Sequence, residues 1–443
     1  MNILYTIFAF TIVLGIIVIV HEFGHYIAAR LMGVRVEVFS FGFGKRLFGK
    51  KVGETDFRVS IFPLGGYVKM AGEEDYDSDD LKPDEFQAKN RAQKIFILLM
   101  GPLMNIILAV IILTIINLTG VKIEKYKLEP PVIGIIHENS PADKAGLKVG
   151  DLILKINNSS VSTWKDLELE IGSNPDMDID IYFKRENRNM STSLKVKSVT
   201  KYNIGDAGIY WNYKVLIKSV KKGSPAESSG LVEDDIIYSI DGIDVNPLNI
   251  SKIISANPNQ LLNFKIKRKD VFIERAIKPG ITGDKVEIGV GLTQYSPMLT
   301  MKYGLIDSFN KSIKDIIKLT SLVFNAFKKM IVGKLSPKNL SGPIEIAKFS
   351  QKAMSSGFSD FFMLIAFISL QLGIVNLFPI PALDGGHLMI YSIEALIRKE
   401  FSMKVKMALI NGGFFLLLTL MAFVILNDIA KNLPNGWNSF LPF

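Results

Sequence analysis

Apolar and polar stretches alternate along this chain at the scale of membrane spans and soluble domains. Long apolar runs occupy residues 1–32, 95–118, 361–380 and 407–427. A helix needs about 20 mainly apolar residues to cross the hydrocarbon core of a bilayer, so each run predicts a transmembrane helix. The polar stretches between the runs are long enough to fold as separate domains. We therefore expect a polytopic α-helical membrane protein with four transmembrane helices that also carries soluble modules.

An internal repeat fills the longest polar stretch. Residues 140–158 (SPADKAGLKVGDLILKINN) align with residues 224–242 (SPAESSGLVEDDIIYSIDG), at an offset of 84 positions (224 minus 140). Each copy predicts a strand, a short helix that begins with Ser-Pro, a glycine and a second strand. We expect two tandem α+β domains at 122–200 and 205–292. Asp234 stands where the first copy has Gly150, which predicts a different turn in the second domain.

The repeated pattern resembles the PDZ module, whose groove binds extended peptides beside an exposed strand. On the sequence alone, the two PDZ-like domains could bind peptides, or they could only exclude bulky substrates.

Two further segments flank the apolar runs. In the loop 33–94, alternating apolar residues followed by Pro-Leu-Gly-Gly predict a β-hairpin within residues 56–69 (DFRVSIFPLGGYVK). This hairpin could be soluble, or it could dip into the membrane and offer an edge strand to a peptide. The segment 300–358 combines an apolar stripe with a row of lysines. It predicts amphipathic helices that lie at the membrane interface or dock on the spans.

Charge and composition refine this picture. The net charge is +9, and basic residues cluster beside the apolar runs. This placement indicates that they orient the spans in the membrane and do not bind nucleic acid. Loop 33–94 and the segment between the last two spans are both rich in Lys and Arg, so both are expected on the cytoplasmic side. The first run lacks a basic leader and a cleavage site of small residues, and we expect it to be a retained span. The chain has no cysteine, which excludes disulfides and thiolate metal sites.

The first apolar run ends in His21-Glu22-Phe23-Gly24-His25, and the chain contains only four histidines. Residues four apart lie on one face of a helix, so His21 and His25 can bind one metal ion, and Glu22 can reach a metal-bound water. A pair of histidines at a helix end with a capping glutamate is the alternative. Ionisable residues are costly in lipid, which favours a functional role for the motif.

A catalytic zinc takes three protein ligands and keeps one position open for water. The first and third spans cross in the same direction, so Asp384, just after the third span, is expected at the depth of the histidines. Asp384 could instead cap the following helix, and His387 is a second candidate for the third ligand. Zinc lowers the pKa of a bound water to about 7, and Glu22 would take its proton. Asn376 could bind the substrate backbone or the oxyanion, or join two helices by a hydrogen bond.

These residues resemble the site-2 protease family of intramembrane zinc metalloproteases, and in particular its bacterial regulator-of-sigma-E branch. Residues 21–25 match the zinc motif of the family, and residues 376–385 match its Asn-Pro-Leu-Asp-Gly motif. Residues 62–67 resemble the membrane-associated hairpin of the family, and residues 101–105 resemble a third motif. The resemblance implies His21, His25 and Asp384 as Zn²⁺ ligands and Glu22 as the catalytic residue.

The resemblance also implies an enzyme of the bacterial inner membrane that cleaves single-span proteins, such as an anti-sigma factor, after an upstream site-1 protease has acted. It further implies clearance of signal-peptide remnants and periplasmic PDZ-like domains. A helical substrate hides its carbonyls, so we expect Asn376 and the hairpin residues Ile61, Gly65 and Gly66 to hold it extended. A non-enzymatic PDZ scaffold and a soluble-type zinc protease tethered to the membrane are the rival interpretations.

Overall fold

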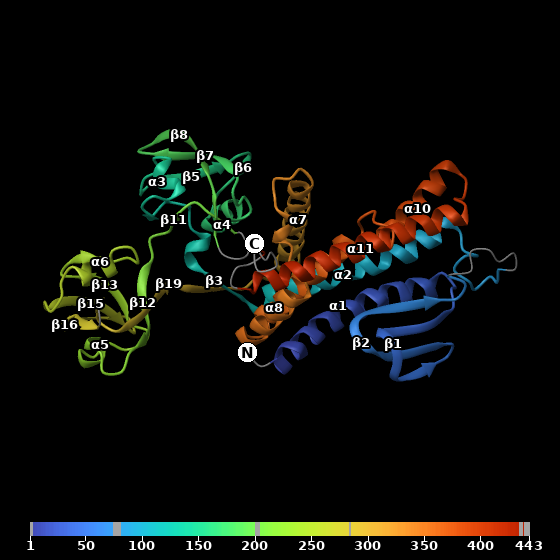
Figure 1. The fold of residues 1–443 in the computed structure, drawn as a ribbon, viewed down its shortest axis with the longest axis horizontal. Helices are drawn as coiled ribbons and strands as arrows, with labels where there is room; N and C mark the ends of the chain where they lie inside the picture. The colour runs from blue at the N-terminus through green and yellow to red at the C-terminus, as the bar shows by residue number, and fades with distance from the viewer. Residues whose placement is uncertain (1–2, 74–80, 200–203, 283–284, 434–436, 438–443) are drawn as a thin grey trace. The chain divides into compact units, whose positions relative to one another are not determined.

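The computed structural model divides into two compact units, one formed by residues 1–121 and 301–443 and the other by residues 122–300. The structure describes residues 3–73, 81–199, 204–282, 285–433 and 437 (Figure 1). The first unit contains α1 (Ile3–Leu31), β1 (Val36–Val52), β2 (Thr55–Met70), α2 (Arg91–Thr119), α7 (Leu305–Ile331), the 3-10 turn η2 (Pro337–Asn339), α8 (Pro343–Ser356), α9 (Phe358–Asn376), α10 (Asp384–Ile397) and α11 (Met403–Lys431).

Among the described residues, four helices are long and apolar enough to cross a membrane: α1, α2, α9 and α11. Helix α2 begins at a capping box, in which Asn90 and Gln93 each satisfy the other's backbone amide. It ends at Gly120, whose φ of 110° no β-branched or bulky residue adopts readily. The sequence therefore sets both ends of this span through local hydrogen bonds and backbone freedom.

The core of the first unit lies where α1, α2 and α9 pack together. Its fully buried side chains include Val13 and Ile17 of α1, Ala109 of α2, and Ile365 and Leu370 of α9. Helix α7 docks on this bundle, because Ile316 enters the core and the Asn117 amide of α2 donates to the Ser312 hydroxyl at 3.1 Å. By contrast, α11 contributes few buried residues, and its apolar surface is largely exposed.

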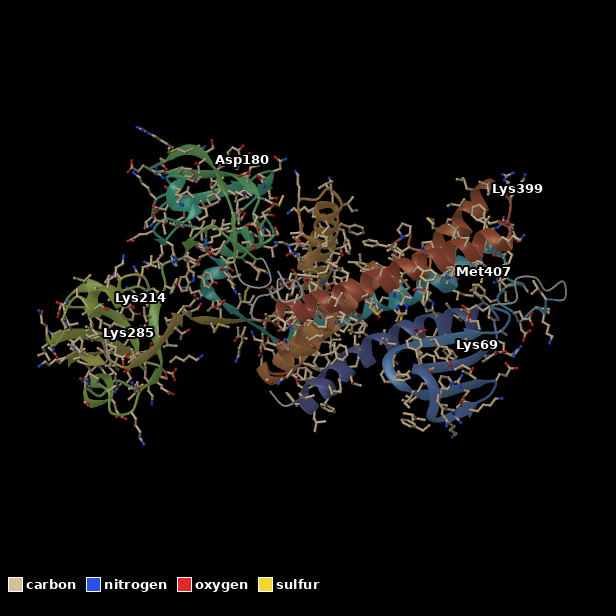
Figure 2. The ribbon with its side chains drawn as sticks, in the orientation of Figure 1. Lys69, Asp180, Lys214, Lys285, Lys399 and Met407 are labelled. Carbon is tan, nitrogen blue, oxygen red and sulfur yellow. The ribbon has the colours of Figure 1, made fainter. Side chains whose placement is uncertain are left out.

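The two basic segments that the sequence assigns to the cytoplasm, 33–94 and the α10–α11 connection, lie at one end of the spans. Arg91, at the start of α2, pairs with Glu400 of the connection between α10 and α11 at 3.8 Å. Figure 2 shows Lys69 of β2 and Lys399 toward this same end. Because α2 starts at Arg91 and crosses the unit, the chain leaves α2 for the second unit at the opposite end.

The segment 56–69 forms a single strand, β2, and the hairpin predicted within it is therefore wrong. Both arms of that segment pair with β1 instead: Phe39 faces Phe57 on one side and Val68 on the other. Strand β1 bends where Gly42 and Gly44 adopt φ of 90° and 88°, conformations that favour glycine. The alternating pattern was that of a strand, but its partner lies earlier in the sequence, where the local pattern of 56–69 gives no signal.

The second unit is built mainly from antiparallel strands. Its elements are β3 (Val121–Glu124), η1 (Lys125–Leu128), β4 (Ile135–Ile136), α3 (Pro141–Lys144), β5 (Leu152–Ile156), β6 (Ser159–Ser160), α4 (Trp164–Gly172), β7 (Asp178–Arg185), β8 (Arg188–Lys195), β9 (Lys197–Val199), β10 (Ile204–Asp206), β11 (Ile209–Tyr210), β12 (Lys214–Val220), α5 (Pro225–Ser228), β13 (Ile236–Ile240), β14 (Ile243–Asp244), α6 (Ile250–Ser255), β15 (Leu262–Arg268), β16 (Val271–Ile277), β17 (Gly280–Thr282), β18 (Lys285–Glu287), β19 (Val290–Tyr295) and β20 (Met298–Met301). The larger sheets run β6-β5-β7-β8 and β16-β15-β13-β12-β19.

Two separate hydrophobic cores in this unit correspond to the two copies of the repeat. The boundary between them differs from the predicted one, because Ala207 and Ile209 belong to the first core. Strand β11 pairs with β4, so the chain returns to the first module before it starts the second.

The two copies share the same local construction. A buried aspartate, Asp151 or Asp235, receives two hydrogen bonds from an arginine, Arg185 or Arg268, at 2.7–2.8 Å. The predicted difference at the turn is also wrong: Gly150 and Asp234 both have positive φ, 93° and 67°. Both amides donate to equivalent carbonyls, those of Ile133 and Ile217, at 2.8 and 2.9 Å. Aspartate tolerates the left-handed region better than most residues, so the turn is retained.

Candidate metal centre

Helix α1 places His21 and His25 on one buried face, with only 7% and 6% of each residue exposed. Their Nε2 atoms lie 3.3 Å apart. The other nitrogen of His25, Nδ1, lies 2.9 Å from the carbonyl oxygen of Ile97. A carbonyl oxygen only accepts, so Nδ1 carries the hydrogen and Nε2 keeps its lone pair. This tautomer presents His25 Nε2 as a metal ligand.

Asp384, the first residue of α10, reaches the histidines. Its carboxylate oxygens lie 3.1 Å from His21 Nε2 and 3.5 Å from His25 Nε2. The helix-capping alternative does not hold. The N-cap position of α10 is Leu383, and no side chain accepts a hydrogen bond from the first amides of the helix. Ala382, two residues earlier, has φ of 103°. A non-glycine residue is strained in this conformation. The surrounding packing must therefore hold the backbone that leads to Asp384.

Glycines make this packing possible. A Cβ on Gly385 would overlap the backbone of Leu377 and Phe378, and one on Gly386 would overlap Ile380. On α11, a Cβ on Gly413 would overlap the carbonyl group of Pro381. The first turn of α10 and the middle of α11 therefore press directly on the backbone that leads to Asp384.

The three side chains fit a divalent cation. One ligand atom from each of His21, His25 and Asp384 lies within 4.8 Å of the others, and the described residues hold no other such cluster. The two Nε2 atoms are 3.3 Å apart, and the nearer carboxylate oxygen of Asp384 lies 3.1 Å from His21 Nε2. Both separations are close to the edge of a tetrahedron, about 3.3 Å, around a zinc about 2.0 Å from each ligand. Asp384 Oδ2 is buried and has no donor with hydrogen-bonding geometry. A cation would satisfy the lone pairs that converge at this point.

Glu22 lies beside the cluster and next to the edge of β2. A Cβ on Gly66 would come within 3.0 Å of Glu22 Cγ and 2.7 Å of Val18, so the strand approaches α1 closely only because Gly66 has no side chain. The Glu22 carboxylate also interacts with the backbone amide of Val68. The half-buried carboxylate therefore lies between the histidines and a strand edge.

The other predicted substrate-binding residues are placed differently. Asn376, the last residue of α9, has its side-chain amide 3.3 Å from His21 Nε2. Gly65 packs against the ring of Phe43, and Ile61 lies beside Gly44 and is 47% exposed. Of the three hairpin residues, only Gly66 is thus placed against a residue of the centre. His387 lies outside the cluster of ligand atoms, so the described geometry selects Asp384 over it.

Asn105 is a site residue to which the sequence analysis gave no role. It is fully buried in α2, and its Nδ2 lies 3.3 Å from His21 Nδ1, while its Oδ1 has no partner among the described residues. If the amide is turned by 180°, its oxygen accepts from His21 Nδ1–H and leaves His21 Nε2 free for a metal. The available signal was a polar residue inside an apolar span.

Helices α1 and α2 approach each other closely at the metal centre. A Cβ on Gly24 would overlap the backbone of Met100, and one on Gly101 would overlap the ring of His25. The two glycines, one on each helix, allow the contact that buries His25 and brings Ile97 within reach of it.

The model of Peptidase family M50 matches residues 9–420. The chain is 32% identical to the regulator of sigma E protease of Haemophilus influenzae, over 97% of this chain and all of that protein. It is 30% identical to a protein of Clostridium acetobutylicum that is named as a zinc metalloprotease, over 97% of each.

Among solved structures, the PDZ domain of an SdrC-like protein from Listeria monocytogenes matches 18% of this chain and 82% of that one, with 22% identity and a TM-score of 0.17. A score of this size does not establish a shared fold.

Proposed function

The chain belongs to peptidase family M50 and is a metalloendopeptidase, and on this premise we propose that it uses zinc to cleave peptide bonds within the membrane segments of single-span proteins. One observation carries the proposal: His21 and His25 of the apolar helix α1 converge with Asp384, which follows the apolar helix α9, and Glu22 lies beside them. Relatives named as zinc metalloproteases support zinc as the metal.

Each residue of the centre has a role in this chemistry. His21, His25 and Asp384 would hold the zinc, which lowers the pKa of a bound water toward about 7 and polarises the substrate carbonyl. Glu22 accepts the proton of the attacking water and then passes it to the leaving amine. Asn376 donates from its side-chain amide to the substrate carbonyl oxygen as negative charge develops there.

The edge of β2 is suited to hold the substrate. A transmembrane helix has all its backbone groups paired internally, so the scissile segment must unwind before attack. An extended segment needs new partners for its amides and carbonyls, and a strand edge provides them. Gly66 and Val68 lie next to Glu22, so a substrate paired with this edge would pass the catalytic carboxylate. We therefore place the substrate clamp at the strand edge formed by residues 66–70.

The topology follows from the basic ends of the spans. The segment 33–94 and the α10–α11 connection would face the cytoplasm of a bacterial inner membrane. The second unit, with its tandem PDZ-like modules, would then be periplasmic, since α2 leads away from the basic end. There the modules would restrict substrates with bulky outer domains.

The substrates we propose are anti-sigma factors already trimmed by an upstream site-1 protease, and remnant signal peptides. Relatives from Haemophilus influenzae and Salmonella typhi are named regulator of sigma E protease, which supports the first class. Substrates of both classes have one span and a short outer segment, so the PDZ-like modules would not exclude them.

A cleavage assay on a single-span substrate tests the proposal. We expect Glu22→Gln to abolish cleavage while the bound zinc stays at the wild-type level, because Glu22 is not a ligand. Asp384→Ala and His21→Ala should lose both zinc and activity. A non-enzymatic scaffold predicts instead that Glu22→Gln changes nothing, and full zinc in Asp384→Ala would exclude Asp384 as a ligand.

The strand clamp has its own test. Tyr67→Pro would break the pairing of β2 with β1, where Tyr67 faces Ser40, and should reduce cleavage with normal zinc content. Tyr67→Ala keeps the backbone amide and serves as the control for loss of the side chain. Equal activity in the proline variant and the wild type would contradict the clamp.

A further inference from the structure

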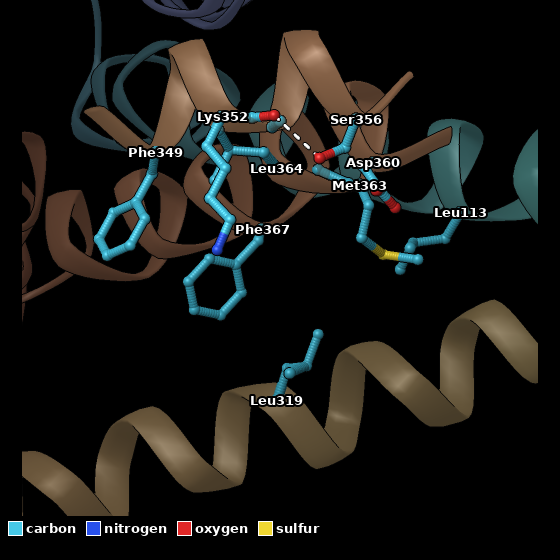
Figure 3. Close-up of a pocket in the computed structure, with 11 residues that line it drawn as sticks. Leu113, Leu319, Phe349, Lys352, Ser356, Asp360, Met363, Leu364 and Phe367 are labelled. Carbon is cyan, nitrogen blue, oxygen red and sulfur yellow. Dashed lines mark hydrogen bonds between the residues drawn. The ribbon is translucent and has the colours of Figure 1, made fainter. Parts of the chain in front are cut away.

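A groove on the first unit lies away from the metal centre. It has a volume of about 480 Å³ and lies between α7, α8, α9 and the end of α2. Its walls are mostly apolar, with Leu113 from α2, Leu319 from α7, Phe349 from α8, and Met363 and Phe367 from α9 (Figure 3). The volume is within the usual range for sites that hold one small organic ligand.

The groove carries one basic side chain. Lys352 extends from α8 toward α7, alongside the rings of Phe349 and Phe367 (Figure 3). One turn earlier on the same helix, Lys348 pairs with Glu345 at 3.4 Å and with Asn432. Among the described residues, the ammonium group of Lys352 has no such partner. An unpaired ammonium group at an apolar groove complements a ligand that has both an anionic group and a hydrocarbon chain.

The depth of the groove fits a molecule of the bilayer. Asp360 lies in the first turn of α9, a candidate span, and Phe367 lies seven residues further along the helix. At 1.5 Å per residue the groove extends about 10 Å along this span. Asp360 is thus at the level where the span begins, and Met363 and Phe367 continue toward the hydrocarbon.

We propose that this groove binds one phospholipid, with an acyl chain along Leu319, Met363 and Phe367 and the phosphate at Lys352. Hydrocarbon is the solvent of the two spans that form one wall, so an acyl chain is the matching occupant. The acidic Asp360 also lines the groove, and it can accept from a headgroup hydroxyl or amine while the phosphate pairs with Lys352. The bound lipid would fill the space between α7 and α9. This proposal is independent of the peptidase activity.

Tryptophan quenching by lipids with brominated chains tests the proposal on the full chain. Phe367→Trp places a reporter in the groove at little cost in shape, and Phe415→Trp places one on the exposed face of α11. The emission of the chain without either substitution is subtracted. As brominated phosphatidylglycerol is added to protein in micelles, we expect Trp at 367 to be quenched at low mole fraction and to saturate. Trp at 415 should follow the bulk mole fraction of the lipid.

Charge variants in the Phe367→Trp background test the phosphate contact. Lys352→Gln should weaken saturable quenching about tenfold, as expected for loss of one hydrogen bond to a charged group. Lys352→Arg and Asp360→Asn should retain it. Helical content by circular dichroism confirms that each variant is folded.

Three results would overturn the proposal. Equal, unsaturable quenching at both reporters would show ordinary bilayer contact. Unchanged lipid binding in Lys352→Gln would contradict the contact between the phosphate and Lys352. An equal loss of binding in Asp360→Asn would contradict it too. If brominated palmitate binds as tightly as the phospholipid, the groove is a fatty-acid site and does not recognise the phosphate.

Discussion

Asn105 is one of the α2 residues that contact the metal centre, and the one that contacts His21. Its side chain is fully buried and lies 3.3 Å from His21 Nδ1. A partner on the second nitrogen of a metal-binding histidine fixes the ring orientation and the tautomer, and its loss typically costs 10–100-fold in metal affinity. Asn105 is in this sense a positioning residue, since its role is exerted through His21.

Substitution of Asn105 distinguishes the two orientations of its amide. We expect Asn105→Leu to weaken zinc binding about 10- to 100-fold, measured by competition with a chelator. Asn105→Asp should restore most of it, because a carboxylate oxygen also accepts from His21 Nδ1–H. If the Asn105 amide instead donates to Nδ1, the aspartate variant will bind zinc as weakly as the leucine variant. Circular dichroism of both variants controls for misfolding.

Sequence reasoning found the candidate ligands because their signals are either local or set by topology. The spacing of His21 and His25 is fixed by the helix, and two spans of the same direction bring Asp384 to the same depth. The contacts of Asn105 with His21 and of Gly66 with Glu22 gave no such signal. Their roles depend on which faces of α2 and β2 turn toward α1, and side-chain packing decides this.

At the scale of single elements, α11 packs through one glycine against the backbone that leads to Asp384. Gly413 packs on the backbone of Pro381, three residues before Asp384, whereas Gly412 faces open space. The two neighbours form a matched pair on one helix. In the interior of a helix, alanine is more favourable than glycine by about 1 kcal/mol, so any loss on substitution must come from the contact.

We expect Gly413→Ala to push α11 or the turn at Pro381 outward, and so to lower both zinc retention and cleavage of a single-span substrate. Overpacking of this kind typically costs about 1–3 kcal/mol. Gly412→Ala should leave both properties at the wild-type level. Normal zinc retention in Gly413→Ala would mean that the turn tolerates displacement of α11.

A second contact fastens the far end of α11. Asp428 is fully buried, and its carboxylate accepts from the amides of Gly342, Ile344 and Glu345 at 2.9–3.1 Å, where α8 begins. We expect Asp428→Ala to increase hydrogen–deuterium exchange in residues 340–346, because these amides lose their acceptor. Asp428→Asn keeps one acceptor oxygen and should show a smaller increase. Unchanged exchange in both variants would mean that other groups hold the start of α8.

The prediction for residues 56–69 failed at this same scale. Alternation identified a strand correctly, but the partner of a strand is a non-local property. Two positive-φ glycines in β1 bend it so that one segment, 38–41, pairs with both arms of β2. Neither the bend nor the pairing is encoded in the local pattern of apolar residues.

At the scale of the whole molecule, the second unit contains the same buried Asp–Arg ion pair twice. Asp151 and Asp235 are completely buried, and each is held by an arginine that also donates to a nearby carbonyl, of Gly146 or Gly230. Each ion pair belongs to a module with a separate hydrophobic core. The repeat was visible in the sequence as aligned letters, while the arginine partners lie in parts that align less clearly.

Loss of the buried ion pair in the second unit should leave the metal centre of the first unit intact. Removing one partner of a buried ion pair typically costs about 3–5 kcal/mol, so Asp235→Ala should open the second module to limited proteolysis within residues 212–282. The metal centre lies in the other unit, and we expect the zinc content of the full chain to be unchanged. If the modules act as a filter, the variant should cleave a substrate with a bulky outer domain faster, and a trimmed substrate at the wild-type rate. A slower cleavage of the trimmed substrate would mean instead that the module helps to bind it.

Asp234→Asn, at the adjacent exposed position, is the matched control, because asparagine also tolerates positive φ.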